Sequence, residues 1–215
     1  MNAREKYAKK YARMFANAMK EIGRNDSDVL HDAFRTRYLT HLNSPEFAEY
    51  SRYKTIALQK VYCAITHAQI CLELGYTLEE AQWIWEKVLS RKFKKLFNRC
   101  MALIDALPNG YKIVAGWLYK DAKARIAENC LTFELLDYSD KKLEYKITRC
   151  AYVEIFEHYG IRNFAKVFCN SDLCMEVMHR HAKFVRYSDL VDGPCCHDAV
   201  IKVDCFGKSG ADKKK

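Results

Sequence analysis

The sequence predicts an α+β fold in which an N-terminal helical half packs on a small antiparallel sheet. Up to about residue 127, apolar side chains recur at three- and four-residue spacing, the period of amphipathic helices. After residue 128, two segments alternate at period 2 and two more are strand-like, with two short helical segments between the pairs. The expected order in this second half is therefore β-β-α-α-β-β.

Five helices are expected in the first half, at about residues 3–22, 27–38, 45–74, 78–103 and 111–126. Ser44 followed by Pro45 is a typical helix start, because Pro is favoured at the first helical position. Thr77 and Glu80 have the spacing of a capping box, in which each side chain bonds the other residue's backbone N–H. Gly75 is expected to end the helix before it.

The second half is predicted to begin with a β-hairpin and to end with two further strands. The expected strands are residues 130–137, 143–148, 183–187 and 196–203, and the helices are residues 150–159 and 171–181. We expect residues 1–127 and 128–206 to form one integrated unit, because no Gly/Ser-rich linker separates them, and residues 207–215 to form a basic tail.

Composition and charge narrow the class of protein. The first residues alternate charged and apolar side chains, unlike a secretory signal, and no long apolar run is present, so a cytoplasmic chain without membrane association is expected. The net charge of +9 comes without a helix-turn-helix, zinc-finger or RNA-binding signature. Hence no nucleic-acid partner is expected, and the basic surface favours small anionic substrates.

Ten cysteines are the unusual feature of the composition. A cytosolic compartment keeps thiols reduced, so a disulfide framework is not expected. Cys63, Cys71 and Cys100 lie in amphipathic segments and are predicted to pack in the core. The other seven follow residue 129, and among them Cys130, Cys174 and Cys205 also look like packing residues.

The first candidate group is Arg149-Cys150-Ala151-Tyr152, where a predicted strand passes into a helix. The positive end of the helix dipole and a neighbouring arginine both favour the thiolate of Cys150. The alternative is a buried cysteine at an element boundary.

The second group is Cys169 and Asp172, which a turn before the next helix would aim at one small volume. Asp172 could instead only supply negative charge to the start of that helix.

The third group is Cys195-Cys196-His197-Asp198, at the start of the last predicted strand. Alternate residues of a strand share a face, so Cys196 can lie beside Asp198, or Cys195 beside His197. A zinc ion would need further ligands from elsewhere, such as Cys150 or Cys169, and no CxxC pair is present, so no metal is expected; zinc or iron is the alternative. Arg186 is either a carboxylate-binding group or a surface residue of a strand.

These groups occur in a specific order along the chain. The run consists of Arg149-Cys150 opening a short helix, then Phe168-Cys169-Asn170-Ser171-Asp172, then a strand with Arg186, then Gly193-Pro194-Cys195-Cys196. This pattern, over about residues 130–205, resembles the L-2-amino-thiazoline-4-carboxylic acid hydrolase family. The layout of helices followed by a sheet more distantly resembles 4-vinyl reductase-type small-molecule-binding domains, in fold and not in chemistry.

The resemblance implies a hydrolase that opens a small cyclic amidine, a thiazoline carboxylate, to N-carbamoyl-cysteine by acting at a C–N or C=N bond. The site residues that it suggests are Cys150 or Cys169 as nucleophile, Asp172 or His197 as proton carrier, Cys196 as a further catalytic residue, Arg186 for the substrate carboxylate, and Arg149 and Tyr152 for substrate binding. A non-catalytic sensor or carrier of small molecules or metal remains the alternative, and so does a cysteine-rich interaction protein. A homo-oligomer is compatible with each of these.

Overall fold

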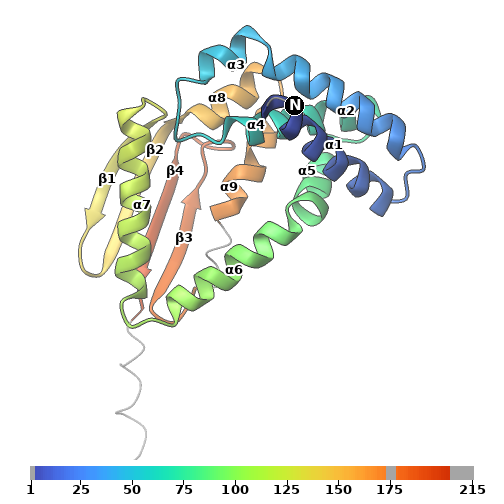
Figure 1. Cartoon of the computed structure of the whole chain (residues 1–215). Coiled ribbons are helices and arrows are strands. Elements are labelled where there is room, and N and C mark those ends of the chain that lie inside the picture. Colours follow the sequence, from blue (N-terminus) through green and yellow to red (C-terminus); the bar gives the residue numbers. More distant parts are fainter. Residues whose placement is uncertain (1–2, 173–177, 204–215) are drawn as a thin grey trace, which may run out of the picture. The chain divides into compact units, whose positions relative to one another are not determined.

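The computed structural model describes residues 3–172 and 178–203 (Figure 1). The chain forms two compact units, each built from two stretches of sequence. One consists of Met1–Lys92 with Ala151–Val167, and the other of Phe93–Cys150 with Phe168–Lys215. We call them the helical unit and the sheet unit. The boundary predicted at residue 127 follows the change from helices to strands along the sequence. In the structure, residues 93–127 belong to the sheet unit, and residues 151–167 belong to the helical unit.

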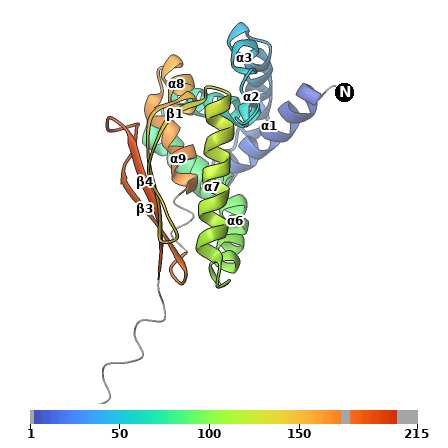
Figure 2. The ribbon, with the colours of Figure 1, turned by 90° about the vertical axis from the view of Figure 1, so that its left-hand side faces the viewer.

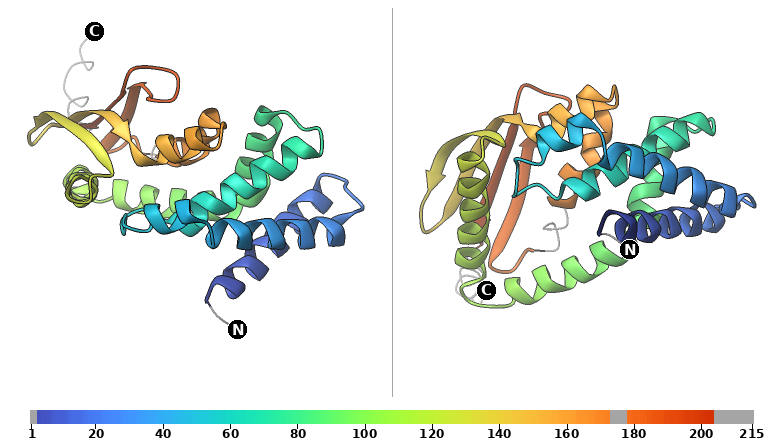
Figure 3. Two further views of the ribbon diagram at one scale, coloured as in Figure 1. Left: turned by 90° about the horizontal axis from the view of Figure 1, so that it is seen from above. Right: turned by 45° about the horizontal axis from the view of Figure 1, so that its top comes forward.

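The helical unit consists of helices of very different length. They are α1 (Ala3–Glu21), α2 (Ser27–Leu42), α3 (Pro45–Tyr50), α4 (Leu58–Glu73), α5 (Leu78–Ile84), a π-helical turn (Trp85–Leu89), α8 (Ala151–His158) and a 3₁₀ turn (Arg162–Ala165). Helices α1 and α2 are joined by a short loop and pack against each other (Figure 3). None of the helices in residues 3–172 and 178–203 is both long and apolar enough to cross a bilayer.

The predicted helix-start signals of this unit are confirmed. The Ser44 hydroxyl accepts the backbone N–H of Phe47 at 3.1 Å, at the start of α3. At the start of α5, Thr77 Oγ1 accepts the N–H of Glu80 at 3.2 Å, and Glu80 Oε2 accepts the N–H of Thr77 at 2.7 Å. Gly75 has a φ of +85°, the left-handed conformation that ends helices and that glycine adopts without strain.

Two long helices predicted from the sequence are interrupted, so those predictions were wrong in extent. The expected helix 45–74 breaks between α3 and α4, where Tyr53 and Ile56 turn into the core and are at most 5% exposed. The expected helix 78–103 widens into the π-helical turn and bends at Ser90 before α6 begins. At the first of these places, tertiary burial overrides local periodicity.

In its described residues, the sheet unit contains one complete helix, nearly all of a second, a four-stranded sheet and the end of a short helix. Its elements are α6 (Arg91–Asp105), α7 (Gly110–Ala127), β1 (Leu131–Tyr138), β2 (Lys142–Cys150), α9 (Lys166–Asp172), β3 (Ala182–Ser188) and β4 (Cys196–Lys202). The strands pair antiparallel throughout in the order β1-β2-β4-β3, and α7 lies along one face of the sheet (Figure 2). The predicted α+β class is confirmed.

Strand register decides which side chains share a face of this sheet. Ile147 of β2 lies opposite Cys196 of β4, and Asp198 lies between Tyr145 and Arg186 on its two neighbouring strands. Directly opposed residues point to the same face. Side chains of this face contribute to the hydrophobic core between the sheet and α7. The buried members of that core are Met101, Tyr111, Val114, Ala115, Leu143, Tyr145, Met178, Ala182, Phe184 and Val200. We call this face of the sheet the covered face.

The prediction of a helix over residues 171–181 was wrong at both ends, because the helix begins earlier, at Lys166, and residues 178–181 are not helical; residues 173–177 lie outside the described residues. Helix α9 ends at Asp172, so Cys169 lies inside a helix rather than ahead of one. Residues 178–181 are not helical, because the carboxylate of Asp105 accepts the backbone N–H groups of residues 179, 180, 181 and 182 at 2.7–3.0 Å. These bonds take the donors that a helix would have used.

Of the cysteines predicted to pack in the core, three are buried and one is exposed among the described residues. Cys63, Cys71 and Cys130 are buried, as expected, with at most 4% of each exposed. Cys100 is exposed on α6, so its predicted place in the core was wrong. Cys174 and Cys205 lie outside the described residues.

Candidate functional site

An arginine–aspartate pair lies on the covered face of the sheet. Arg186 Nε and Nη2 donate to the two carboxylate oxygens of Asp198 at 2.8 and 3.0 Å, and Arg186 Nη1 donates to the backbone carbonyl of Cys169 at 2.9 Å. The side chains of Arg186 and Asp198 are 13% and 3% exposed. A single guanidinium thereby connects β3, β4 and α9, with the two-pronged geometry that arginine offers to carboxylates.

Cys196 lies beside this pair and is predominantly protonated near neutral pH. Its Sγ accepts the backbone N–H of Leu190 at 3.3 Å. Burial raises the pKa of its thiol to about 11, and the charges of Asp198 and Cys150 act in the same direction, against the opposing effects of the Leu190 N–H and Arg186. Since the thiolate is the nucleophilic form, Cys196 is a poor nucleophile under these conditions.

Cys150 and Cys169 are the other two thiols of this region. Cys150 is the last residue of β2 and is half-buried, and its charge influences the pKa of Cys196. Cys169 is half-buried in α9, with its carbonyl held by Arg186. The sheet unit therefore groups three predicted site cysteines around the Arg186–Asp198 pair. We call these three the thiol cluster.

His197 lies on the opposite face of the sheet from Cys196, because successive residues of a strand alternate. Its Nε2 lies 2.8 Å from Glu144 Oε1, and its ring lies 4.6 Å from that of Tyr187. Bonds from Lys142 and His197 hold the pKa of the Glu144 carboxyl below its ordinary value. The structure thus separates His197 from the Cys196–Asp198 pair and gives it a carboxylate partner.

The remaining predicted residues lie at the ends of elements. Arg149 Nη1 donates to the Asn129 carbonyl at 2.8 Å and to its side-chain oxygen at 3.3 Å. Tyr152 is half-buried in α8 of the helical unit. Asp172 is the last residue of α9, and its side chain lies outside the described part of the structure.

Sequence reasoning placed Asp198 in the third candidate group but gave it no role, and it did not name Glu144 at all. Asp198 carried a usable signal, since it shares a strand face with Cys196 two residues away. The pairing of Glu144 with His197 depends on the register between β2 and β4. Nothing in the local sequence determines that register, so Glu144 carried no comparable signal.

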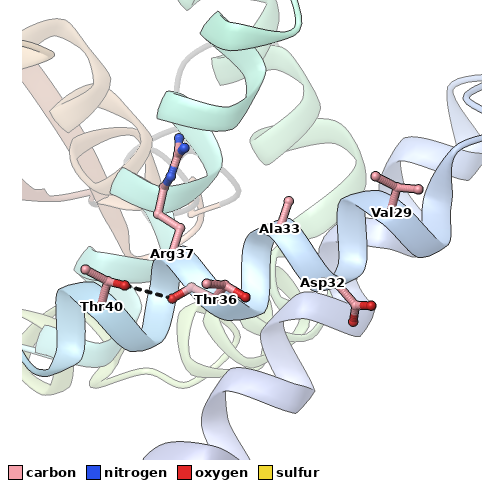
Figure 4. A pocket seen from close by; sticks show the side chains of 6 residues that line it. All are labelled: Val29, Asp32, Ala33, Thr36, Arg37 and Thr40. Carbon is pink, nitrogen blue, oxygen red and sulfur yellow. Dashed lines mark hydrogen bonds between the residues drawn. The ribbon is translucent and has the colours of Figure 1, made fainter.

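Surface hollows among the described residues are lined by side chains other than those of the thiol cluster. One is on α2 and is lined by Val29, Asp32, Ala33, Thr36, Arg37 and Thr40 (Figure 4). All of its lining side chains come from a single helix, and Arg37 is engaged by Glu73 at 2.6 Å. Another is lined by α6 together with His179 and Arg180. Within residues 3–172 and 178–203, no three His, Cys, Asp or Glu side chains gather as metal ligands would.

Comparison with known proteins adds one finding. The model of the L-2-amino-thiazoline-4-carboxylic acid hydrolase family matches residues 66–198, which is more than half of the chain. The matched segment includes all three members of the thiol cluster and both members of the arginine–aspartate pair. No curated protein and no solved structure matches the chain.

Proposed function

The chain belongs to the L-2-amino-thiazoline-4-carboxylic acid hydrolase family, and on this premise we propose that it hydrolyses a C–N or C=N bond of a small cyclic amidine or amide bearing a carboxylate. The observation that carries the proposal is the family match, which extends through the thiol cluster. The family is named for a hydrolase of a thiazoline carboxylate, so such a ring is the first substrate to test.

Cys150 and Cys169 are the proposed nucleophiles, in preference to Cys196, whose raised pKa keeps it protonated. For a thiazoline, a thiolate from one of them adds to the amidine carbon across its C=N bond, and the bond from that carbon to the ring sulfur breaks, which frees the substrate thiol. Water then adds to the same carbon and displaces the enzyme sulfur, which leaves the N-carbamoyl product and restores the enzyme thiol. The product then contains one water more than the substrate. Alternatively, the cysteine orients a water that attacks the same carbon.

Proton transfer in this mechanism is assigned to Asp172 or His197, as the sequence indicated. Glu144 fixes the orientation of the His197 imidazole, but His197 lies on the opposite face of the sheet from Cys196, so Asp172 is the preferred proton carrier. Arg186 is assigned to the substrate carboxylate. Because Asp198 already fixes the orientation of its guanidinium, binding would not require that side chain to be ordered. Arg149 and Tyr152 are the proposed additional contacts.

Single replacements test the nucleophile. Cys150→Ser and Cys169→Ser are compared with the wild-type protein and with Cys100→Ser, in which an exposed thiol of the same unit is removed. We expect one of the first two to lose product formation, as followed by mass spectrometry, and the control to retain it. Full activity in both variants would refute the covalent mechanism.

A second candidate function is a non-catalytic sensor or carrier on the same scaffold. The protonated, buried Cys196 and the mutual pairing of Arg186 and Asp198 favour it, because these groups fit a binding site that performs no turnover. Metal analysis of protein purified without a tag tests one form of it. Stoichiometric zinc or iron that is lost in Cys196→Ser would support this function, and metal-free protein would count against it.

A further inference from the structure

Helix α6 has two apolar faces, and only one of them packs in the core of the sheet unit. Its side chains Phe97, Met101 and Ile104 pack on the core of the sheet unit. A second line of side chains is exposed and consists of Phe93, Leu96, Cys100, Leu103 and Leu107, the last just beyond the helix end. We call this line the α6 stripe. The exposed fractions of its apolar members are 50%, 63%, 71% and 45% in chain order, Cys100 aside.

Single exposed apolar residues are common, but a contiguous line of them marks a binding surface. The spacing in the α6 stripe is three, four, three and four residues, which is the a/d pattern of a helix that packs on another helix. The pattern therefore favours a helical partner over a flat surface. Cys100 lies at the centre of the stripe.

Charge on α6 is distributed unevenly along its length. Lys95 and Arg99 are exposed in the N-terminal and central part, beside the stripe. In the C-terminal part, the exposed Ala102 and Ala106 are uncharged and Asp105 is buried. Two parallel α6 helices would bring their basic parts together. An antiparallel pair instead places the basic part of each helix beside the uncharged end of the other, where the helix dipole is negative.

We propose that the α6 stripe pairs antiparallel with the α6 stripe of a second copy of this chain. The pair is two-fold symmetric, and each stripe buries the other. The stripe is about 20 Å long at 1.5 Å per residue, so alone it gives a smaller interface than the roughly 800 Å² per partner of standard complexes. The dimer is accordingly concentration-dependent. This inference does not depend on the proposed hydrolase activity.

The antiparallel arrangement predicts which thiols are neighbours. With Cys100 central in the stripe, the two copies of Cys100 lie within about one helical turn of each other along the axis. The two copies of Lys95, by contrast, lie toward opposite ends of the pair. A short thiol–thiol crosslinker therefore joins two chains through Cys100 but not through a cysteine at position 95.

The test combines sedimentation velocity over a range of concentrations with crosslinking by a short bis-maleimide. We expect a dimer whose fraction rises with concentration, and a covalent dimer that is lost in Cys100→Ser. Lys95→Cys in the Cys100→Ser background is expected to give no covalent dimer. Leu96→Glu and Leu103→Glu introduced together are expected to raise the dimer dissociation constant roughly thirtyfold or more. This is the effect typical of removing one central side chain from an interface.

The matched control is Val29→Glu, which places the same charge at a 70% exposed apolar residue of α2. It is expected to leave dimerisation unchanged. Circular dichroism checks that each variant is folded, and the Cys100 crosslink requires no change to the stripe. A monomer at every concentration, a dimer that survives the two leucine replacements, or a crosslink through position 95 would each overturn the proposal.

Discussion

Removing the carboxylate of Asp198 should destabilise the protein strongly. Asp198→Ala leaves the Arg186 guanidinium, 13% exposed, without the partner that accepts from Nε and Nη2. Breaking a buried ion pair by removing one partner costs about 3–5 kcal/mol, because the remaining charge stays desolvated. We therefore expect the free energy of unfolding to fall by about 4 kcal/mol, less what the Cys169 carbonyl compensates. Urea unfolding measured by circular dichroism determines this difference.

A double-mutant cycle separates the pair from general damage to the fold. Replacing both residues, as Arg186→Met with Asp198→Leu, should cost less than the sum of the two single changes, since no charge is left buried. Lys112 and Asp140 form the control pair, at 3.6 Å with side chains 69% and 89% exposed. Removing Asp140 should change stability by less than about 1 kcal/mol. Equal small effects at both pairs would refute the interpretation of Arg186–Asp198 as a buried clamp.

Three further predictions follow from buried groups. Burial lowers the pKa of His67 from 6.5 to about 4. Because the imidazole of the unfolded chain binds a proton at higher pH than that of the folded protein, acid favours unfolding. About 3 kcal/mol of the free energy of unfolding should therefore be lost as pH falls from 6.5 to 4. In His67→Phe that slope should flatten in pH-dependent denaturation; an unchanged slope would contradict the assignment. Asp105→Ala removes the acceptor of four backbone N–H groups and should lower the free energy of unfolding by at least about 3 kcal/mol, as measured by thermal unfolding. A loss below about 1 kcal/mol would mean that residues 179–182 keep their conformation without this carboxylate. Cys196 should react with iodoacetamide far more slowly than the exposed Cys100, as peptide mass spectrometry would reveal; comparable rates would contradict its burial and raised pKa.

Local signals predicted much of this fold correctly. The capping box at Thr77 and Glu80 and the cap at Ser44 involve residues three apart, so their geometry follows from the sequence itself. The two pairs of strands followed from period-2 alternation and strand-like composition, and the family resemblance followed from motifs in order. These features depend on short-range contacts.

The errors share a different cause, which is competition from distant residues. The carboxylate of Asp105 bonds backbone groups more than seventy positions away, and these bonds hold residues 179–181, part of a predicted helix, in a non-helical conformation. The register between β2 and β4 placed His197 near Glu144, and the register between β3 and β4 placed Asp198 opposite Arg186. Cys100 was expected in the core because α6 has two apolar faces, and periodicity alone does not tell which one is buried.

The central claim is that this chain hydrolyses a small cyclic amidine that carries a carboxylate. The most direct measurement is incubation of the purified protein with L-2-amino-thiazoline-4-carboxylate, followed by mass spectrometry of the small molecules. The account predicts catalytic formation of a ring-opened product that contains one additional water. It also predicts that Cys150→Ser or Cys169→Ser abolishes this product. Unchanged substrate after prolonged incubation with folded protein would contradict the claim.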